Sequence, residues 1–136
     1  MKILVVEDEE PQRRVLTALV SRWGHEVVEA SSGKEALCAA SAADFDLYLL
    51  DVFLPDTTAM ELIPQLRALG AGAPVITLTG RSSRELERRL RELGIAYYMA
   101  KAVAAVELKS ILDHRERLPR PSGRGRPHPA PPPAIL

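Results

Sequence analysis

The segment LYLLDVFLP, residues 47–55, decides the fold, because it places a carboxylate at the end of an apolar run. Residues 47–50 have the composition of a buried strand, Asp51 follows directly, and Pro55 closes the segment. An ionised carboxylate is costly to bury unless another group compensates its charge. Asp is also common in turns, where its side chain accepts hydrogen bonds from backbone N–H groups. Taken alone, the segment favours the turn interpretation, so the role of Asp51 depends on the rest of the chain.

On both sides of this segment the chain alternates strand and helix patterns up to about residue 115. Short apolar runs predict strands at 2–6, 25–30, 47–50, 74–79 and 95–100. Apolar residues at helical spacing, together with end signals, predict helices at 11–24, 33–43, 60–70, 83–93 and 104–116. Strands this apolar need helices on both faces. The pattern therefore predicts an α/β fold with a doubly wound, five-stranded parallel sheet and right-handed crossovers.

Two features of the second helix can be predicted from its sequence. Ser31 or Ser32 can cap its N-terminus, and Glu35 is placed to complete a capping box on Ser32. The single cysteine, Cys38, lies in EALCAA and is expected to be a small buried helix residue.

The third and fourth helices carry further signals. Pro64 is tolerable in the third helix only within its first turn. In the fourth helix, Glu85–Arg89 and Glu87–Arg91 are pairs four residues apart in the favourable orientation.

Composition limits the class of protein. The chain has 136 residues, 46% hydrophobic and 26% charged, which suits one domain with a real core. No apolar run approaches the roughly 18 to 20 residues that cross a bilayer, and the acidic N-terminal segment is not a usable signal peptide. One cysteine excludes an internal disulfide, and with three scattered histidines it offers no zinc ligand set. These facts predict a cytoplasmic protein with no membrane association.

Charge divides the chain into two parts. Residues 1–115 carry 14 Lys and Arg against 17 Asp and Glu, whereas residues 116–136 carry four Arg against one Glu and hold seven of the 11 prolines. Such a segment cannot bury a core. We expect a folded domain at 1–116 and a disordered Pro/Arg-rich tail at 117–136. A nucleic-acid or SH3-type ligand role for the tail has little support.

The functional residues are expected where the strands of a parallel sheet end, because sites in such sheets lie at the carboxyl edge. The residues at these ends are Glu7, Asp8, Glu9 and Glu10 after the first strand, Asp51 after the third, Thr79 on the fourth and Lys101 after the fifth. Adjacent first and third strands would bring Asp8 and Asp51 within a few ångströms. Two carboxylates about 4 Å apart repel by roughly 4 kcal/mol at an effective dielectric of 20, so a cation must compensate them.

Oxygen ligands of this kind suit Mg²⁺. Thr79 adds a hydroxyl and Lys101 a mobile positive charge, and together with a metal these groups suit the binding of a phosphoryl group. Asp51 would be the nucleophile, giving an aspartyl phosphate.

With these residues in place, the chain resembles the receiver domain of bacterial two-component response regulators, over residues 1 to about 116. The matching motifs are Glu7–Asp8 in VVEDEE, Asp51 in LLDVFLP, Thr79 in ITLTG and Lys101 in YYMAK. The resemblance implies a CheY-like, flavodoxin-like fold with strand order 2-1-3-4-5. It also implies phosphorylation of Asp51 by a sensor histidine kinase or phosphotransfer protein, with Mg²⁺ as the cofactor.

The same resemblance assigns finer roles. The metal ligands would be Asp8, Asp51 and the backbone carbonyl of Phe53, with Glu7 acting indirectly. Tyr98 matches the aromatic switch position that responds to Thr79.

From the residues alone, Tyr97 is as good a switch candidate as Tyr98. Phe53 and Arg81 match positions that influence hydrolysis of the phosphoaspartate, and we expect them to shield it from water. Gly80 leaves room for a phosphodonor.

The sequence departs from the family pattern twice. Lys101-Ala102 replaces the usual Lys-Pro, and a cis bond before a non-proline residue costs roughly 2.5 to 4 kcal/mol, so we expect a trans peptide. Ala59 stands where the family tends to place glycine, which predicts a different loop path if that position needs positive φ.

The output surface is expected at residues 83–116. The resemblance implies a stand-alone receiver or the excised part of a longer protein. It predicts no enzymatic activity beyond self-phosphorylation and autodephosphorylation, and no direct DNA binding. The sequence is compatible with a homodimer as well as with a monomer.

Two alternatives compete with this interpretation, and a third fails. A degenerate receiver would bind partners without phosphorylation. A phosphatase of the haloacid dehalogenase type would need a second Asp where Phe53 stands. A dinucleotide-binding domain would need a glycine-rich turn in place of VEDEE.

Overall fold

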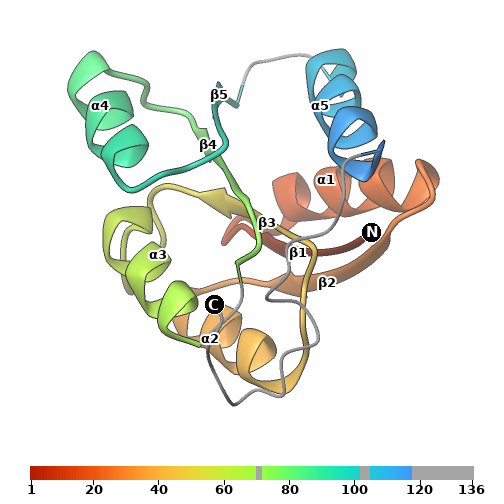
Figure 1. The fold of residues 1–136 in the computed structure, drawn as a ribbon, viewed down its shortest axis with the longest axis horizontal. Helices are drawn as coiled ribbons and strands as arrows, with labels where there is room; N and C mark the ends of the chain where they lie inside the picture. Colours follow the sequence, from red (N-terminus) through yellow and green to blue (C-terminus); the bar gives the residue numbers. More distant parts are fainter. Residues whose placement is uncertain (70–71, 102–104, 118–136) are drawn as a thin grey trace.

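The five apolar segments form one parallel sheet. The computed structural model describes residues 1–69, 72–101 and 105–117. Its strands are β1 (Lys2–Val6), β2 (Glu26–Ala30), β3 (Leu47–Asp51), β4 (Val75–Thr79) and β5 (Tyr97–Ala100). All neighbouring strands are parallel, in the order β2-β1-β3-β4-β5 (Figure 1). The predicted fold class and strand order are therefore confirmed.

Helices cover both faces of the sheet, as the apolar strands require. They are α1 (Glu10–Arg22), α2 (Gly33–Ala42), α3 (Ala59–Ala68), α4 (Arg84–Glu92) and α5 (Ala105–Arg117). Helices α1 and α5 lie together on one side, and α2, α3 and α4 lie on the other (Figure 1).

The central strand β3 is buried on both faces. Tyr48 and Leu50 belong to the core under α2, α3 and α4, whereas Leu47 and Leu49 belong to the core under α1 and α5. Successive side chains of a strand point to opposite faces, so a run of four apolar residues serves two cores. This double burial holds the end of β3, and with it Asp51, in a fixed position.

Two predictions for α2 need correction. Ser32 is the N-cap and accepts from the Glu35 N–H, but the Glu35 carboxylate bonds the backbone N–H and hydroxyl of Ser31 instead of returning to Ser32. Cys38 is exposed, so its predicted burial is wrong. The buried face of α2 runs through Ala36 and Ala40, and Cys38 lies about 200° around the helix from each.

The prediction that Pro64 is confined to a first turn is also wrong. Helix α3 begins at Ala59, which places Pro64 in its second turn. The side chain is exposed, so water can solvate the carbonyl of Met60 that loses its usual N–H partner.

Helix α4 forms one of its two predicted pairs. Arg91 contacts Glu87 at 2.8 Å. Glu85, however, pairs with Arg88 at 2.6 Å rather than with Arg89. Residues three and four apart both lie within reach on a helix, and Arg88 is also held by Glu92 at 2.7 Å.

Two expectations fall on parts of the chain outside the described residues. These are the disorder of the tail beyond Arg117 and the geometry of the Lys101-Ala102 peptide. Within the described ranges, none of the helices has the length and apolar character needed to span a bilayer.

Candidate functional site

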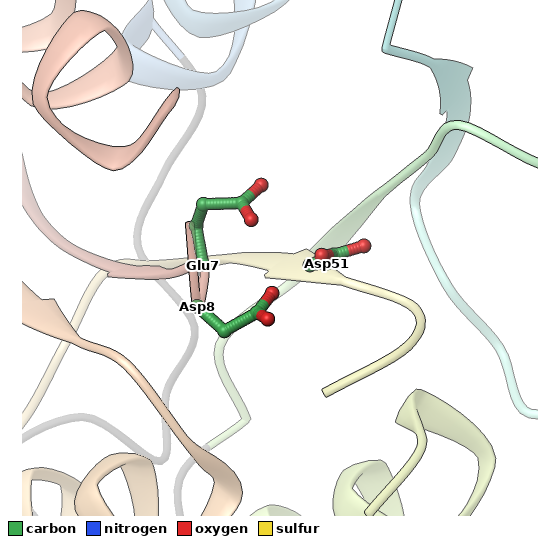
Figure 2. A group of neighbouring side chains, drawn as sticks. All are labelled: Glu7, Asp8 and Asp51. Carbon is green, nitrogen blue, oxygen red and sulfur yellow. The ribbon is translucent and has the colours of Figure 1, made fainter. Parts of the chain in front are cut away.

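Three carboxylates meet at the carboxyl edge of the sheet. Val6 of β1 pairs in register with Leu50 of β3, so the residues that follow them, Glu7 and Asp51, leave the sheet side by side. Asp8 comes next along the chain. One carboxylate oxygen from each of the three residues lies within 4.8 Å of the others (Figure 2). The predicted proximity of Asp8 and Asp51 is therefore confirmed, and it follows from the adjacency of β1 and β3.

The three acids differ in burial. Glu7 is 1% exposed and Asp51 5% exposed, whereas Asp8 is exposed. The Glu7 side chain is held in place because its Oε2 accepts from the backbone N–H of Glu9 at 3.1 Å. Two buried carboxylates side by side are unfavourable without a cation.

Lys101 supplies the cation. It follows β5, two strands away from β3, and its long side chain reaches back across the end of β4. Its Nζ donates to Asp51 Oδ2 at 3.1 Å and lies 2.8 Å from Glu7 Oε1. The contact with Glu7 is an ion pair without hydrogen-bond geometry, so Glu7 Oε1 is buried with no hydrogen bond. This oxygen retains capacity for a further partner.

Burial dominates the electrostatics of Asp51. It raises the pKa of this carboxyl from 3.8 to about 6, and the neighbouring charge of Glu7 acts in the same direction, while the hydrogen bond from Lys101 opposes both. Burial by itself would lower the pKa of Lys101, but the contacts with Glu7 and Asp51 outweigh it and raise that pKa. The site is thus short of positive charge.

The donor set fits a hard divalent cation. Three carboxylates face one ammonium group, all the acidic donors are oxygens, and Glu7 Oε1 lacks a hydrogen bond. The backbone of Phe53 lies beside Asp51, because its N–H donates to Asp51 Oδ1 at 3.4 Å. These residues suit Mg²⁺ by charge and by donor chemistry.

Asp51 pairs in register with Leu78 of β4, so the next residue and last of that strand, Thr79, lies beside the site. Its side chain is 1% exposed, and its hydroxyl accepts from the backbone N–H of Arg81 at 3.0 Å. Its carbonyl accepts from the N–H of Lys101 at 2.8 Å, which ties the ends of β4 and β5 together. The hydroxyl therefore lies at the start of the loop that leads to α4.

The two adjacent tyrosines of β5 face opposite sides of the sheet. Tyr98 is half-buried against the core under α4, and its hydroxyl contacts Ser82 Oγ at 3.0 Å and accepts from the N–H of Ser83 at 3.3 Å. Tyr97 packs on the other core, with the Arg115 guanidinium 5.8 Å from its ring centroid. Of the two, Tyr98 is the one that contacts the loop following Thr79.

Phe53 and Arg81 meet over the strand ends. The guanidinium carbon of Arg81 lies 5.3 Å from the centroid of the Phe53 ring, within the range of a cation–π contact. The sequence indicated both residues singly but not this contact. Among the described residues, a Cβ added at Gly80 would meet only the Lys101 side chain, at 3.8 Å, which is an ordinary van der Waals contact.

Asp56 is a further residue that the sequence did not indicate. It lies in the loop after β3, and its carboxylate bonds the N-terminus of α2. The contact joins residues more than 20 positions apart, and an Asp after Pro in a turn carries no signal for it.

The described residues thus form a flavodoxin-like α/β domain with an acidic site at the carboxyl edge of its sheet. The family model of the response regulator receiver domain matches residues 3–113. The chain belongs to this family, as the resemblance implied.

Relatives agree with this assignment. The probable transcriptional regulatory protein SilR of Salmonella typhimurium is 36% identical over 108 residues, which cover 79% of this chain and 47% of SilR. The alkaline phosphatase synthesis transcriptional regulatory protein PhoP of Bacillus subtilis is 38% identical over 120 residues, covering 85% of this chain and 50% of PhoP. The chain spans about half the length of these curated relatives.

Solved structures show the same architecture. The chemotaxis protein CheY4 of Vibrio cholerae is 28% identical, with a TM-score of 0.77, and the match covers 83% of this chain and 96% of that one. A CheY-like receiver domain of Methanospirillum hungatei is also 28% identical, with a TM-score of 0.75 and coverage of 85% and 95%.

Proposed function

We propose that this receiver domain is a phosphorylation-dependent switch that accepts a phosphoryl group on Asp51 from a sensor histidine kinase or phosphotransfer protein. The observation that carries the proposal is the group of Glu7, Asp51 and Lys101, which meet at the carboxyl ends of β1, β3 and β5 with both carboxylates buried. A carboxylate held this way is costly to keep. It becomes useful when a phosphoryl group and a divalent cation bind beside it.

The proposed reaction transfers a phosphoryl group from an imidazole nitrogen of the donor to a carboxylate oxygen of Asp51. An oxygen of ionised Asp51 bonds to phosphorus while the bond between phosphorus and the donor imidazole breaks. The electron pair of that bond stays on the imidazole nitrogen, which takes up a proton from solvent. Lys101 already donates to Asp51 Oδ2 and can donate to an oxygen of the incoming phosphoryl group.

Mg²⁺ would offset the negative charge of the phosphoryl group and orient its oxygens. Asp8, Asp51 and the backbone carbonyl of Phe53 would hold it, and Glu7 would act through a water molecule or a hydrogen bond. Phosphorylation adds about −1.5 to −2 charges. The phosphoryl group and the acids together carry more negative charge than Lys101 alone, or the metal ion alone, can offset.

The proposed switch runs from Thr79 to the α4 surface. In the described state the Thr79 hydroxyl accepts from the N–H of Arg81, and the Tyr98 hydroxyl contacts the same loop. A phosphoryl group on Asp51 is a stronger acceptor for Thr79 and would draw this loop inward, so that Tyr98 loses its contacts with Ser82 and Ser83. Residues 83–116 would then present a changed surface to a downstream protein. This is a population shift between two packings.

Intact mass spectrometry tests the proposal directly. Incubation with acetyl phosphate and Mg²⁺ should add one phosphoryl group to the wild type and none to Asp51→Asn. Asp113→Asn, which changes an exposed carboxylate of α5 paired with Lys109, should be phosphorylated like the wild type. Absence of an adduct, together with failure to bind beryllofluoride, would instead favour a degenerate receiver that works as an interaction module.

The contact between Phe53 and Arg81 supports a second part of the proposal, namely that the phosphoaspartate is shielded from water. The ring of Phe53 contacts the guanidinium of Arg81, and the backbone N–H of Phe53 donates to Asp51, so the pair would cover the phosphoaspartate on the side of this loop. The double variant F53N R81E should shorten the half-life of phosphorylated protein severalfold, measured by loss of the phosphoryl mass after donor removal. Arg84→Glu, at the start of α4, is the charge-matched control and should leave the half-life unchanged. An unchanged half-life in the double variant would refute shielding.

A further inference from the structure

The loop between β3 and α3 is closed by its own backbone. Phe53 and Thr58 form an antiparallel bridge. The N–H of Leu54 donates to the carbonyl of Thr57 at 3.0 Å, and the N–H of Ala59 donates to the carbonyl of Val52 at 2.8 Å. Ala59 is the first residue of α3, so this position has helical backbone and has no need of the glycine usual in the family. These bonds make the loop one rigid unit. A contact that fixes one part of the loop therefore also fixes the position of the rest.

Asp56 attaches this unit to α2. Its Oδ1 accepts from the N–H of Gly33 at 2.9 Å and its Oδ2 from the N–H of Lys34 at 3.0 Å. These are the first two N–H groups of α2, which have no partner within the helix, and Ser32 bonds the N–H of Glu35 instead. The backbone bonds lower the pKa of Asp56, in keeping with a carboxylate at the positive end of a helix.

Gly33 shows how closely the loop approaches. A Cβ at this position would lie 2.4 Å from Cγ2 of Thr57, nearer than any van der Waals contact allows. The absence of a side chain at Gly33 is thus a condition for the loop to reach the helix.

The loop between β3 and α3 starts beside Asp51, the carboxylate proposed to accept the phosphoryl group. The N–H of Phe53 donates to Asp51 Oδ1, and the ring of Phe53 contacts Arg81. From the start of α2 to Asp51 the contacts are continuous.

We propose that Asp56 is a positioning residue: by fastening the loop to the N-terminus of α2 it fixes the backbone of Phe53 beside Asp51, and so sets the affinity of the site for a divalent cation. The inference rests on the proposed function for the presence of the cation. It goes further in making α2, which contributes no ligand, a determinant of the site.

The first test replaces the carboxylate by its neutral isostere. In Asp56→Asn one of the two bonds to α2 is lost, and the Kd for Mg²⁺ measured by isothermal titration calorimetry should rise about tenfold. Phosphorylation by acetyl phosphate should slow at low Mg²⁺ and return to the wild-type rate at saturating Mg²⁺. Glu61→Gln is the matched control, since the bond that Glu61 accepts comes from the Thr57 hydroxyl of the same loop and not from α2, and its Kd should stay at the wild-type value.

The second test acts from the side of α2. Gly33→Ala should push Thr57 away and raise the Kd for Mg²⁺, and the double variant G33A T57S, which lacks Cγ2, should restore it. A purely structural role predicts lower thermal stability in G33A with an unchanged Kd, which would overturn the inference. Wild-type protein that binds no Mg²⁺ would overturn the proposed function as well, whereas equal affinities of wild type, D56N and G33A would overturn the inference alone.

Discussion

Two regions of this molecule are rich in charge, and they are built in opposite ways. On α4, Arg88 lies 2.6 Å from Glu85 and 2.7 Å from Glu92, and Arg91 lies 2.8 Å from Glu87. All of these side chains are at least 38% exposed. The partners are three or four residues apart, so the helix alone brings them together.

At the carboxyl edge of the sheet, the ion pairs are buried and distant in sequence. Lys101 lies 2.8 Å from Glu7 and 3.1 Å from Asp51, at similar distances to those on α4. The side chains of its partners are 1% and 7% exposed, and these residues precede Lys101 by 94 and 50 positions. The whole sheet is needed to bring them together.

The distance of an ion pair therefore says little about its contribution to stability. Exposed pairs are solvated in either state and contribute little. In the buried group, two carboxylates have left water and share one ammonium, so loss of the ammonium leaves two uncompensated charges, whereas loss of one carboxylate leaves a balanced pair. The buried group is therefore a poor source of stability and a good site for binding a cation and a phosphoryl group.

Removing the ammonium should have the largest effect. Lys101→Met leaves Glu7 and Asp51 buried without their cation, and we expect the free energy of unfolding in EDTA to fall by about 2 to 4 kcal/mol, measured by urea titration. Saturating Mg²⁺ should restore part of the loss, because a divalent cation can replace the ammonium.

Lys109→Met is the matched control for this prediction. It breaks an exposed pair with Asp113 on α5 and should change little. Equal stabilities of K101M and K109M would show that the two regions do not differ as argued.

Removing one carboxylate should have a smaller effect of opposite sign. Burial raises the pKa of Asp51 from 3.8 to about 6, so the folded state binds its proton more tightly than the unfolded state. The stability that the protonated form contributes is present below pH 4 and is lost as pH rises through 6. In EDTA at pH 7.5, Asp51→Asn should therefore be more stable than wild type by about 1 to 2 kcal/mol, after allowance for solvent screening.

The pH dependence distinguishes this cause from a packing effect. The stability difference between D51N and wild type should shrink as pH falls from 6 to 4, followed by urea unfolding at several pH values. A difference that does not change with pH would assign the gain to something other than the charge of Asp51.

The sequence predicts the site well because topology determines it. Apolar strands require a parallel sheet, and the ends of its strands meet at one edge, so Asp8, Asp51 and Lys101 could be grouped before any coordinates.

What the sequence did not predict depends on side-chain reach and on contacts between distant segments. Glu85 has partners within reach at both three and four residues, and the spacing alone does not choose Arg88 over Arg89. Cys38 has the size and polarity of a core residue, but the buried face of α2 passes through alanines on the other side. The bonds from Asp56 to α2 depend on the exact approach of two loops, for which no local pattern exists.

The smallest effect is expected on α4. Glu87→Gln removes the contact with Arg91 and should lower the free energy of unfolding by about 0.2 to 0.5 kcal/mol at low salt. Since both side chains are exposed, the ions of 1 M NaCl should screen most of this difference. Urea unfolding of wild type and E87Q at both salt concentrations measures it. Salt should alter the loss caused by K101M much less, because buried charges are poorly screened. If E87Q cost as much as K101M and were equally insensitive to salt, α4 would be a second site of stored electrostatic energy rather than a solvated surface.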